Sequence, residues 1–278
     1  MMIKRYCNNY ANNTFLAEDK ASLLVSDLAI QRGYGIFDFF KTINGKPIFL
    51  EDHLKRFYNS IAKMHMEIKQ SPDELKEILQ DLQQINDIPD SGIKMIVTGG
   101  YSEDGYTQPA KQNLIITQTP FVAPTTYNAN GISLATYHYQ RPLSEMKTID
   151  YSMAIWLQPW LKEQKADDVL YQHGNVVREC PRANFFIVTK NHEVITAKNN
   201  VLHGVIRKNI LGLRGAGFKI TERDFIMEEL QNASEAFITS TTKHILPVKM
   251  IDQVPLTGDG AVTQLLADLL LQKVKAQY

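Results

Sequence analysis

Three short stretches of the sequence carry residue types that could do chemistry together. Lys147 supplies a primary amine, and Glu179 supplies a carboxylate in a polar turn between two runs of apolar and β-branched residues. The stretch Leu-His-Gly-Val-Ile-Arg, residues 202–207, begins a helix, and the N–H groups at a helix start suit a phosphate. An amine nucleophile, a carboxylate and a phosphate site are what pyridoxal phosphate requires.

The amine of Lys147 must be uncharged to attack an aldehyde, so burial or a neighbouring positive charge has to lower its pKa. Arg141 and the ring cation of the cofactor are the candidate neighbours. Taken alone, this lysine would be interpreted as an ordinary solvated residue. Its spacing to Glu179 favours the catalytic role, in which one lysine forms the Schiff base and also moves a proton.

Glu179 is expected to face the pyridine nitrogen of the cofactor. A carboxylate there favours the protonated ring, which withdraws electrons when the Cα–H bond of the substrate breaks. Its apolar flanks indicate burial, and a buried carboxylate needs a cationic partner; an exposed turn glutamate is the alternative. Asn184 is expected to support the turn by hydrogen bonding, or merely to cap it.

The phosphate group is expected to bind where the helix begins, at Gly204, through the backbone of Val205 and Ile206. Arg56 offers a fork of donors that fits a phosphate. Hydroxyl groups of a polar turn would add further contacts, namely those of Ser240, Thr241 and Thr242. Together these residues form the predicted phosphate site.

Six motifs in this order resemble the class IV aminotransferases, pyridoxal-phosphate enzymes of fold type IV. The motifs are Arg-Gly-Tyr-Gly-Ile-Phe-Asp (32–38), His-Leu-Lys-Arg-Phe (53–57), Lys-Thr-x-x-Tyr (147–151), Glu-x-x-x-x-Asn-x-Phe (179–186), Leu-x-Gly-x-x-Arg (202–207) and Thr-Ser-Thr-Thr (239–242). The resemblance covers nearly the whole chain. It implies transfer of an amino group between an amino acid and a 2-oxo acid by a ping-pong cycle. It also implies that Leu202 packs on the pyridine face, and that the protein is a homodimer with its active site near the subunit interface.

Substrate binding is where this sequence departs from its relatives. Arg32 stands where D-amino acid and branched-chain enzymes usually carry tyrosine or phenylalanine, and Gly99 stands where D-amino acid aminotransferases place a carboxylate-binding arginine. In the family the hairpin that carries Phe37 reaches the active site of the partner subunit. Arg32, Lys94 or Arg182 is therefore a candidate to bind the substrate's α-carboxylate. A surface ion pair is the alternative for Arg32, and an ordinary strand residue is the alternative for Lys94.

The favoured activity is transamination of D-amino acids, because a relocated arginine suggests a carboxylate site unlike that of the branched-chain enzymes. The branched-chain group acts on L-amino acids, and aminodeoxychorismate lyases, which the resemblance also covers, would need a pocket for a bulky carboxylated ring. Both remain alternatives at this point. So does a protein that binds the cofactor without turnover, because motif retention alone does not show activity.

Composition sets limits on partners and location. The counts of Lys+Arg and of Asp+Glu are both 30, so no nucleic-acid-binding surface is indicated. No apolar run reaches the length of a membrane span and the N-terminus has no apolar signal region, so a cytoplasmic protein is expected. The cysteines, Cys7 and Cys180, and the seven histidines show no metal-ligand spacing, so no metal is expected.

A chain of 278 residues is expected to form two domains. The predicted class is α/β (α+β), with a small α/β domain over residues 1–119, a linker over 120–124 and a larger, β-barrel-like cofactor-binding domain with helices over 125–278. This arrangement is that of fold type IV.

Periodicity predicts the elements that position these residues. Apolar residues three and four apart predict helices over 50–66, 153–161, 205–213, 226–230 and 262–274, and Ser-Pro-Asp-Glu at 71–74 has the pattern of a capping box. Strands are expected over 22–25, 36–42, 93–98, 114–119, 132–138 and 237–240, with a strand-dense block over 169–196. Asn44-Gly45 should form a hairpin turn, and Pro159 should kink or end its helix.

Overall fold

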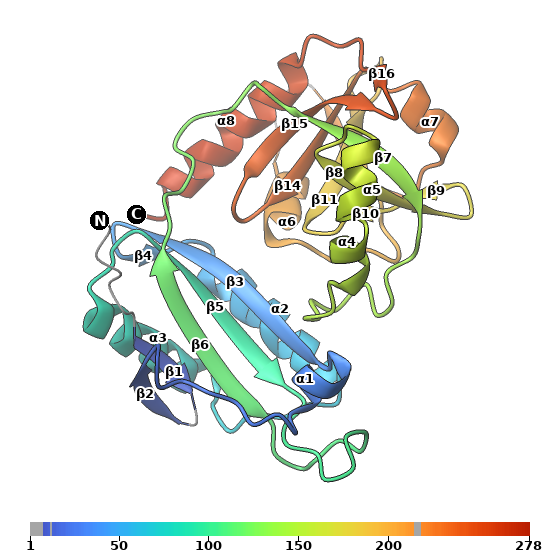
Figure 1. Cartoon of the computed structure of the whole chain (residues 1–278). Coiled ribbons are helices and arrows are strands. Elements are labelled where there is room, and N and C mark those ends of the chain that lie inside the picture. Colours follow the sequence, from blue (N-terminus) through green and yellow to red (C-terminus); the bar gives the residue numbers. More distant parts are fainter. Residues whose placement is uncertain (1–7, 12, 214–217) are drawn as a thin grey trace. The chain divides into compact units, whose positions relative to one another are not determined.

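A computed structural model describes residues 8–11, 13–213 and 218–278 of the chain (Figure 1). These residues form two compact units. The first contains the described residues up to Ala123 together with Met146–Asp150 and Gln277–Tyr278, and the second contains Pro124–Glu145 and Tyr151–Ala276. Lys147 therefore belongs to the first unit, whereas the domain boundaries predicted from chain order assign it to the second.

The first unit is a sheet with helices on one face (Figure 1). Its six described strands lie in the order β2-β1-β6-β5-β3-β4, and each neighbouring pair is antiparallel. The elements are β1 (Asn8–Ala11), β2 (Thr14–Ala17), α1 (Leu28–Arg32), β3 (Gly35–Ile43), β4 (Lys46–Pro47), α2 (Leu50–Lys63), α3 (Pro72–Asn86), β5 (Ser91–Thr98) and β6 (Asn113–Pro120).

The alternation of side chains along β3 separates two environments. Ile36 and Phe40 are fully buried under α2 and α3, where they pack in one core cluster with Phe57. Complete burial of a residue such as Phe57 contributes about 1.5 to 3 kcal/mol relative to leaving it exposed. The other face of the sheet carries the partly exposed Phe37 and Lys94. One face thus stabilises the unit, and the other presents polar and aromatic groups.

The second unit is built on a mixed sheet. Its described strands follow the order β13-β12-β11-β14-β15-β7-β8-β9, with β10 paired to β11 and β16 paired to β15. The elements are β7 (Ile132–His138), α4 (Ser152–Trp156), α5 (Gln158–Glu163), β8 (Asp168–His173), β9 (Val176–Val177), β10 (Glu179–Cys180), β11 (Ala183–Val188), β12 (Glu193–Thr196), α6 (Val205–Leu211), β13 (Lys219–Glu222), α7 (Met227–Gln231), β14 (Glu235–Ser240), β15 (His244–Ile251), β16 (Val254–Pro255) and α8 (Ala261–Lys275).

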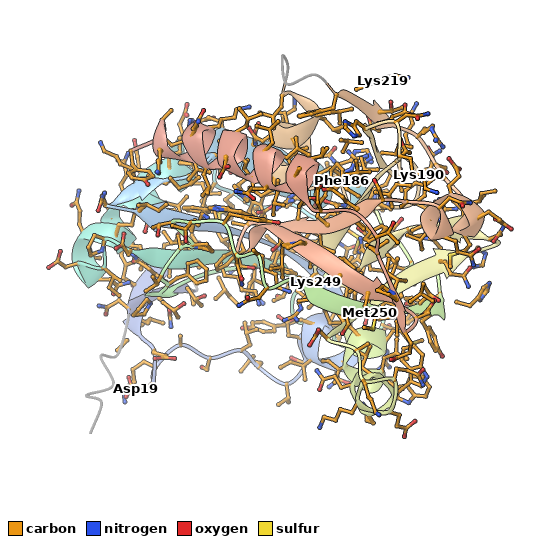
Figure 2. All side chains as sticks on the ribbon, turned by 90° about the horizontal axis from the view of Figure 1, so that it is seen from above. Asp19, Phe186, Lys190, Lys219, Lys249 and Met250 are labelled. Carbon is orange, nitrogen blue, oxygen red and sulfur yellow. The ribbon has the colours of Figure 1, made fainter. Side chains whose placement is uncertain are left out.

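Strand β11 lies inside this sheet, between β12 and β14, and all six of its residues are buried. Phe186 is fully buried and stacks on Phe237 of β14, with the ring centroids 4.8 Å apart. By contrast, Lys190 and Lys219, labelled in Figure 2, are exposed. The central strand is therefore a rigid support for the residues next to it in the sheet.

Several local predictions are confirmed, and one is wrong. The capping box of α3, the Asn44-Gly45 turn between β3 and β4, and the helix start at Gly204 are all present. The predicted helix over 153–161 is two short helices, α4 and α5, with Pro159 in the first turn of the second, as the proline effect predicts. The predicted strand over 22–25 is not formed, because Leu24 and Val25 are 61% and 76% exposed and pair with no strand.

Candidate active site

Lys147 lies on a short segment that pairs with the start of β3. The N–H of Phe37 donates to the carbonyl oxygen of Lys147 at 2.8 Å, and the N–H of Ile149 donates to the carbonyl oxygen of Gly35 at 3.0 Å. A Cβ atom at Gly35 would lie 2.9 Å from the carbonyl oxygen of Val97 and 2.8 Å from Cδ1 of Ile149, so glycine is needed for this close approach. The pairing fixes the backbone of Lys147 at the sheet edge.

The side chain of Lys147 is directed over the ring of Phe37, with Nζ 4.5 Å from the ring centroid. Lys94 of β5 contacts the same ring, with its Nζ at 4.7 Å. Burial lowers the pKa of Lys94 below its ordinary value. The first unit therefore brings two amines to one aromatic ring, and one of them is the predicted nucleophile.

Asp38, His53 and Arg56 form a buried polar cluster between β3 and α2. Nε and Nη2 of Arg56 donate to the two carboxylate oxygens of Asp38 at 2.7 and 2.8 Å, and Nδ1 of His53 lies 2.7 Å from Oδ1. Burial opposes ionisation of Asp38, but the charges of Arg56 and His53 and their hydrogen bonds outweigh it, so the pKa of Asp38 lies well below its usual range. A phosphate bound by Arg56 would therefore have to use Nη1, with Asp38 orienting the guanidinium.

Glu179 lies on β10 in the second unit and is 5% exposed. Its Oε1 accepts from Nε and Nη2 of Arg141 at 3.2 and 3.1 Å, and its Oε2 accepts from the N–H of Leu202 at 2.9 Å. Charged and backbone donors of this kind stabilise an ionised carboxylate in a buried position. The cationic partner expected for a buried Glu179 is thus Arg141, which the sequence analysis considered as a neighbour of Lys147.

Asn184 joins Glu179 to the start of α6. The two residues are directly opposite in the β10–β11 pair, and Nδ2 of Asn184 donates to the carbonyl oxygen of Leu202 at 2.6 Å and to Oε2 of Glu179 at 3.4 Å. A Cβ atom at position 204 would lie 2.2 Å from Oδ1 of Asn184, so Gly204 is required there. Sheet register and a tight backbone approach therefore place the carboxylate beside the helix start.

The predicted phosphate donors lie near this row in the sheet. Thr239 of β14 is paired with Asn184, and Ser240 follows it at the end of the strand. Oγ of Ser240 lies 3.2 Å from Oγ1 of Thr242, and Thr241 and Thr242 are at least partly exposed. No side chain caps the N-terminus of α6 at Gly204. Hydroxyl and backbone donors for an anion therefore lie at the end of β14 and at the start of α6.

The predicted substrate-binding arginines are both exposed. Arg32 ends α1, and its Nη1 donates to the carbonyl oxygen of Gln31 at 2.7 Å. It forms no ion pair with the residues that the structure describes, so the surface ion pair considered for it is absent. Arg182 lies in the turn between β10 and β11, and its charge, with that of Lys243, opposes the burial that raises the pKa of Asp168.

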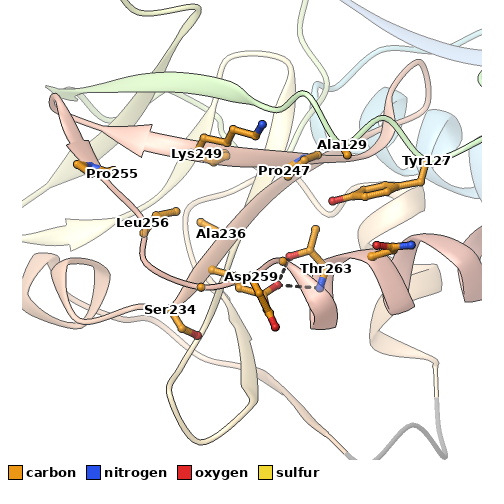
Figure 3. Close-up of a pocket in the computed structure, with 15 residues that line it drawn as sticks. Tyr127, Ala129, Ser234, Ala236, Pro247, Lys249, Pro255, Leu256, Asp259 and Thr263 are labelled. Atoms are coloured by element: carbon orange, nitrogen blue, oxygen red, sulfur yellow. Dashed lines mark hydrogen bonds between the residues drawn. The ribbon is translucent and has the colours of Figure 1, made fainter.

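A separate pocket of about 390 Å³ lies between β14, β15 and the start of α8 (Figure 3). Within it, Glu235 caps the helix by accepting from the N–H and Oγ1 of Thr263 at 2.8 and 2.6 Å. The lining includes none of the residues predicted to bind cofactor, so the hydrogen-bonded row around Glu179 is the better candidate in this unit. No described helix could span a membrane, and no described cluster of His, Cys, Asp or Glu could hold a metal ion.

Comparison with known families bears directly on this arrangement. The family model described as amino-transferase class IV matches residues 35–251, which include Lys147, Glu179 and Ser240. This chain is a class IV aminotransferase. The family, the two-domain mixed α/β fold and the transaminase class predicted from the sequence motifs are thereby confirmed.

The relatives of this aminotransferase are named for several different activities. It is 28% identical to a D-alanine aminotransferase of Bacillus licheniformis over 258 residues, 90% of each chain, and 26% identical to one of Listeria monocytogenes over 95% of this chain and 94% of that one. Its fold is similar to that of the Escherichia coli branched-chain aminotransferase, with a TM-score of 0.87, 19% identity and coverage of 98% and 96%. Its fold is also similar to that of a putative 4-amino-4-deoxychorismate lyase of Legionella pneumophila, with a TM-score of 0.83 and 23% identity. The match covers 92% of this chain and 97% of that one.

The sequence analysis of this aminotransferase did not predict the buried polar cluster of Asp38, His53 and Arg56. His53 and Arg56 were visible three residues apart on a predicted helix, a spacing that places both on one face, and Asp38 was visible in a predicted strand. Their contact depends on how that helix packs on the strand. Lys41 of β3 was not singled out, yet it is fully buried, and burial lowers its pKa to about 7.

Replacing Asp38 with asparagine is expected to lower the free energy of unfolding of the aminotransferase by about 3 to 5 kcal/mol at neutral pH, because Arg56 loses its buried partner. The depressed pKa of Asp38 means that its contribution is complete above the unfolded value of about 3.9 and declines as the pH falls below it. The difference between wild type and variant should therefore shrink in acid.

Urea unfolding at a series of pH values measures this difference. Asp81→Asn is the matched control, because Asp81 is exposed on α3 in the same unit; its effect should stay within about 0.5 kcal/mol. A penalty for Asp38→Asn that stays constant into acid would show that the ionised carboxylate is not the source of the stability.

Proposed function

We propose that this class IV aminotransferase acts on D-amino acids and transfers their amino group to a 2-oxo acid. The observation that supports this substrate class is similarity to D-alanine aminotransferases along nine tenths of both chains. The branched-chain neighbours are less than 25% identical to it and support only the fold. A half-reaction screen with paired D- and L-amino acids tests the proposal, and a clear preference for L-amino acids would contradict it.

Pyridoxal phosphate is the cofactor that the described residues fit. The second unit offers a buried carboxylate at Glu179, together with backbone and hydroxyl donors for an anion at Gly204 and Ser240. The bound cofactor would supply an electron-withdrawing ring that stabilises negative charge at the substrate's Cα. Glu179 would hold a proton on the ring nitrogen, while Arg141 and Leu202 keep the carboxylate ionised and oriented.

Lys147 would bind the cofactor's aldehyde through Nζ and would be displaced by the amino group of the substrate. Nζ then holds the proton taken from the substrate's Cα and releases it in the second step. The backbone pairing of Lys147 with β3 restricts its motion to the side chain, which suits a group that must act in both steps. The proposed phosphate contacts are completed by the backbone of Val205 and Ile206, by the hydroxyls of Thr241 and Thr242, and by Nη1 of Arg56.

Arg32 is proposed to bind the substrate's α-carboxylate, with Arg182 as the second candidate. Arg32 is exposed and its guanidinium contacts no described carboxylate, so its donors are available for a ligand. The resemblance to the family implies a homodimer in which the segment carrying Arg32 and Phe37 reaches the active site of a second copy. Analytical ultracentrifugation would test the dimer, and a monomer at enzymatically active concentrations would contradict it.

Replacing Arg32 with alanine should weaken substrate binding by about 2 to 5 kcal/mol, the range for losing one partner of a desolvated charge pair. Arg32→Lys should recover only part of this loss, because a point charge does not replace a forked donor. The measurement is the apparent Kd from single-turnover absorbance. Gln31→Ala, next to it on α1, is the control, and unchanged substrate affinity in Arg32→Ala would assign the carboxylate to another residue.

A further inference from the structure

Lys94 and Lys147 bring two primary amines to one aromatic ring. Their Nζ atoms lie 4.7 and 4.5 Å from the centroid of Phe37, so the two nitrogens are no farther apart than the sum of these distances, whichever faces of the ring they occupy. Lys94 comes from β5, and Lys147 comes from the segment that pairs with β3. Sheet pairing therefore holds both backbones in place.

A carboxylate neutralises the charge of Arg56 but not that of Lys94. In the first unit Asp38 pairs with Arg56 at 2.7 Å. Within the described part of the chain, no carboxylate pairs with Lys94. The charge of an ammonium group at Lys94 is therefore not neutralised by a described carboxylate.

The surroundings of the two amines are partly withdrawn from water. Burial lowers the pKa of Lys94. The pKa of the fully buried His53 is lowered first by its own burial and then by the positive charges of Arg56 and Lys147. Charges in such positions are screened less than exposed ones, so two like charges near one ring repel each other strongly. The ring attracts each ammonium group singly, but it does nothing to remove the repulsion between two.

We propose that Lys94 is an electrostatic partner of Lys147, whose positive charge keeps the amine of Lys147 uncharged and nucleophilic near neutral pH. Lys94 acts in this role through Lys147 and needs no contact with the reacting atoms. The catalytic use of the uncharged amine of Lys147 rests on the proposed function. The coupling between the two charges is a property of the chain that can be measured without any cofactor.

The test is to titrate both amines in the folded, full-length chain after any bound cofactor has been removed. Trace acetylation with acetic anhydride from about pH 6 to pH 11, quantified by mass spectrometry of the peptides with Lys94 and Lys147, gives a titration curve for each amine. Lys147 should titrate below the ordinary lysine value of about 10.4. Lys94→Gln should raise the pKa of Lys147 by about one unit, which is a roughly tenfold loss of neutral amine at pH 7.

Two variants separate charge from structure. Lys94→Arg keeps the charge and should leave the pKa of Lys147 within a few tenths of a unit of wild type. Lys46→Gln makes the same chemical change as Lys94→Gln at an exposed position of β4 in the same sheet, and it should have no effect. An equal pKa of Lys147 in Lys94→Gln and in Lys46→Gln would overturn the proposal.

The coupling must also be mutual. In Lys147→Arg position 147 keeps a positive charge, so the pKa of Lys94 should lie about one unit below its value in Lys147→Gln, which carries no charge there, because the interaction between two charges is reciprocal. These two variants decide alone if Lys94→Gln does not fold, and an equal pKa of Lys94 in both would refute the coupling. Failure of the proposed function would show differently, as the absence of a reducible cofactor adduct on Lys147 in a chain whose two amines are coupled.

Discussion

Replacing Lys147 with alanine is expected to lower the rate of transamination by roughly 10⁴-fold or more, because in the proposed mechanism one amine both binds the cofactor covalently and moves the proton. The residue lies on a segment whose backbone hydrogen bonds to β3 do not involve the side chain, so the fold should be retained. The cofactor should still bind noncovalently, because the proposed phosphate donors are on other residues. The measurement is borohydride reduction followed by peptide mass spectrometry, together with the rate of the half-reaction.

Lys190→Ala is the matched control for this variant, since Lys190 extends from the surface of the second unit and should leave both readings unchanged (Figure 2). The alternative that deserves direct inspection is Lys94, the other amine at the ring of Phe37. A reducible adduct on Lys94 in the wild-type protein would exchange the roles of the two lysines.

The second large effect is expected for Glu179→Gln, which should slow the half-reaction by about 10²- to 10⁴-fold while cofactor occupancy barely changes. A neutral amide can still accept the hydrogen bond from the N–H of Leu202, but it no longer favours a proton on the ring nitrogen. It also leaves Arg141 without its carboxylate. Single-turnover absorbance gives the rate, and the absorbance of the protein at saturation gives the occupancy.

Glu228→Gln is the control for Glu179→Gln, because Glu228 is exposed on helix α7, where its Oε2 accepts from Nδ2 of Asn175 at 3.0 Å. It removes the same charge without touching the row of residues around β11. Near-normal half-reaction rates in Glu179→Gln would remove the carboxylate from the mechanism, whatever its structural partners.

Features set by neighbours in the chain were predictable from the sequence. The buried stripe of α2, the capping box of α3 and the turn at Asn44-Gly45 each depend on residues within one or two turns of each other. The six short motifs were sufficient to predict the family because their order along the chain is specific to it. The position of Glu179 beside Asn184 also follows from a short hairpin between them.

Features set by long-range packing were not predictable in the same way. The pairing of Lys147 with β3, and the contact of Asp38 with His53 and Arg56, join segments whose approach no local pattern encodes. The strand predicted over 22–25 failed for the same reason, because its alternation lacked a partner strand. A single sequence gives the residues of such contacts but not the choice of partner, which depends on the free energy of the whole fold.

The membership of Met146–Asp150 in the first unit has a consequence for the order in which the protein can fold during synthesis. The edge of β3 at Gly35 and Phe37 receives its hydrogen bonds from residues made more than a hundred positions later, so a nascent chain that ends at Ala123 carries this edge unpaired. Closing so long a loop is slow and costs conformational entropy. This edge is completed only by the segment that carries Lys147, so the proposed nucleophile is positioned only after the chain has entered its second unit.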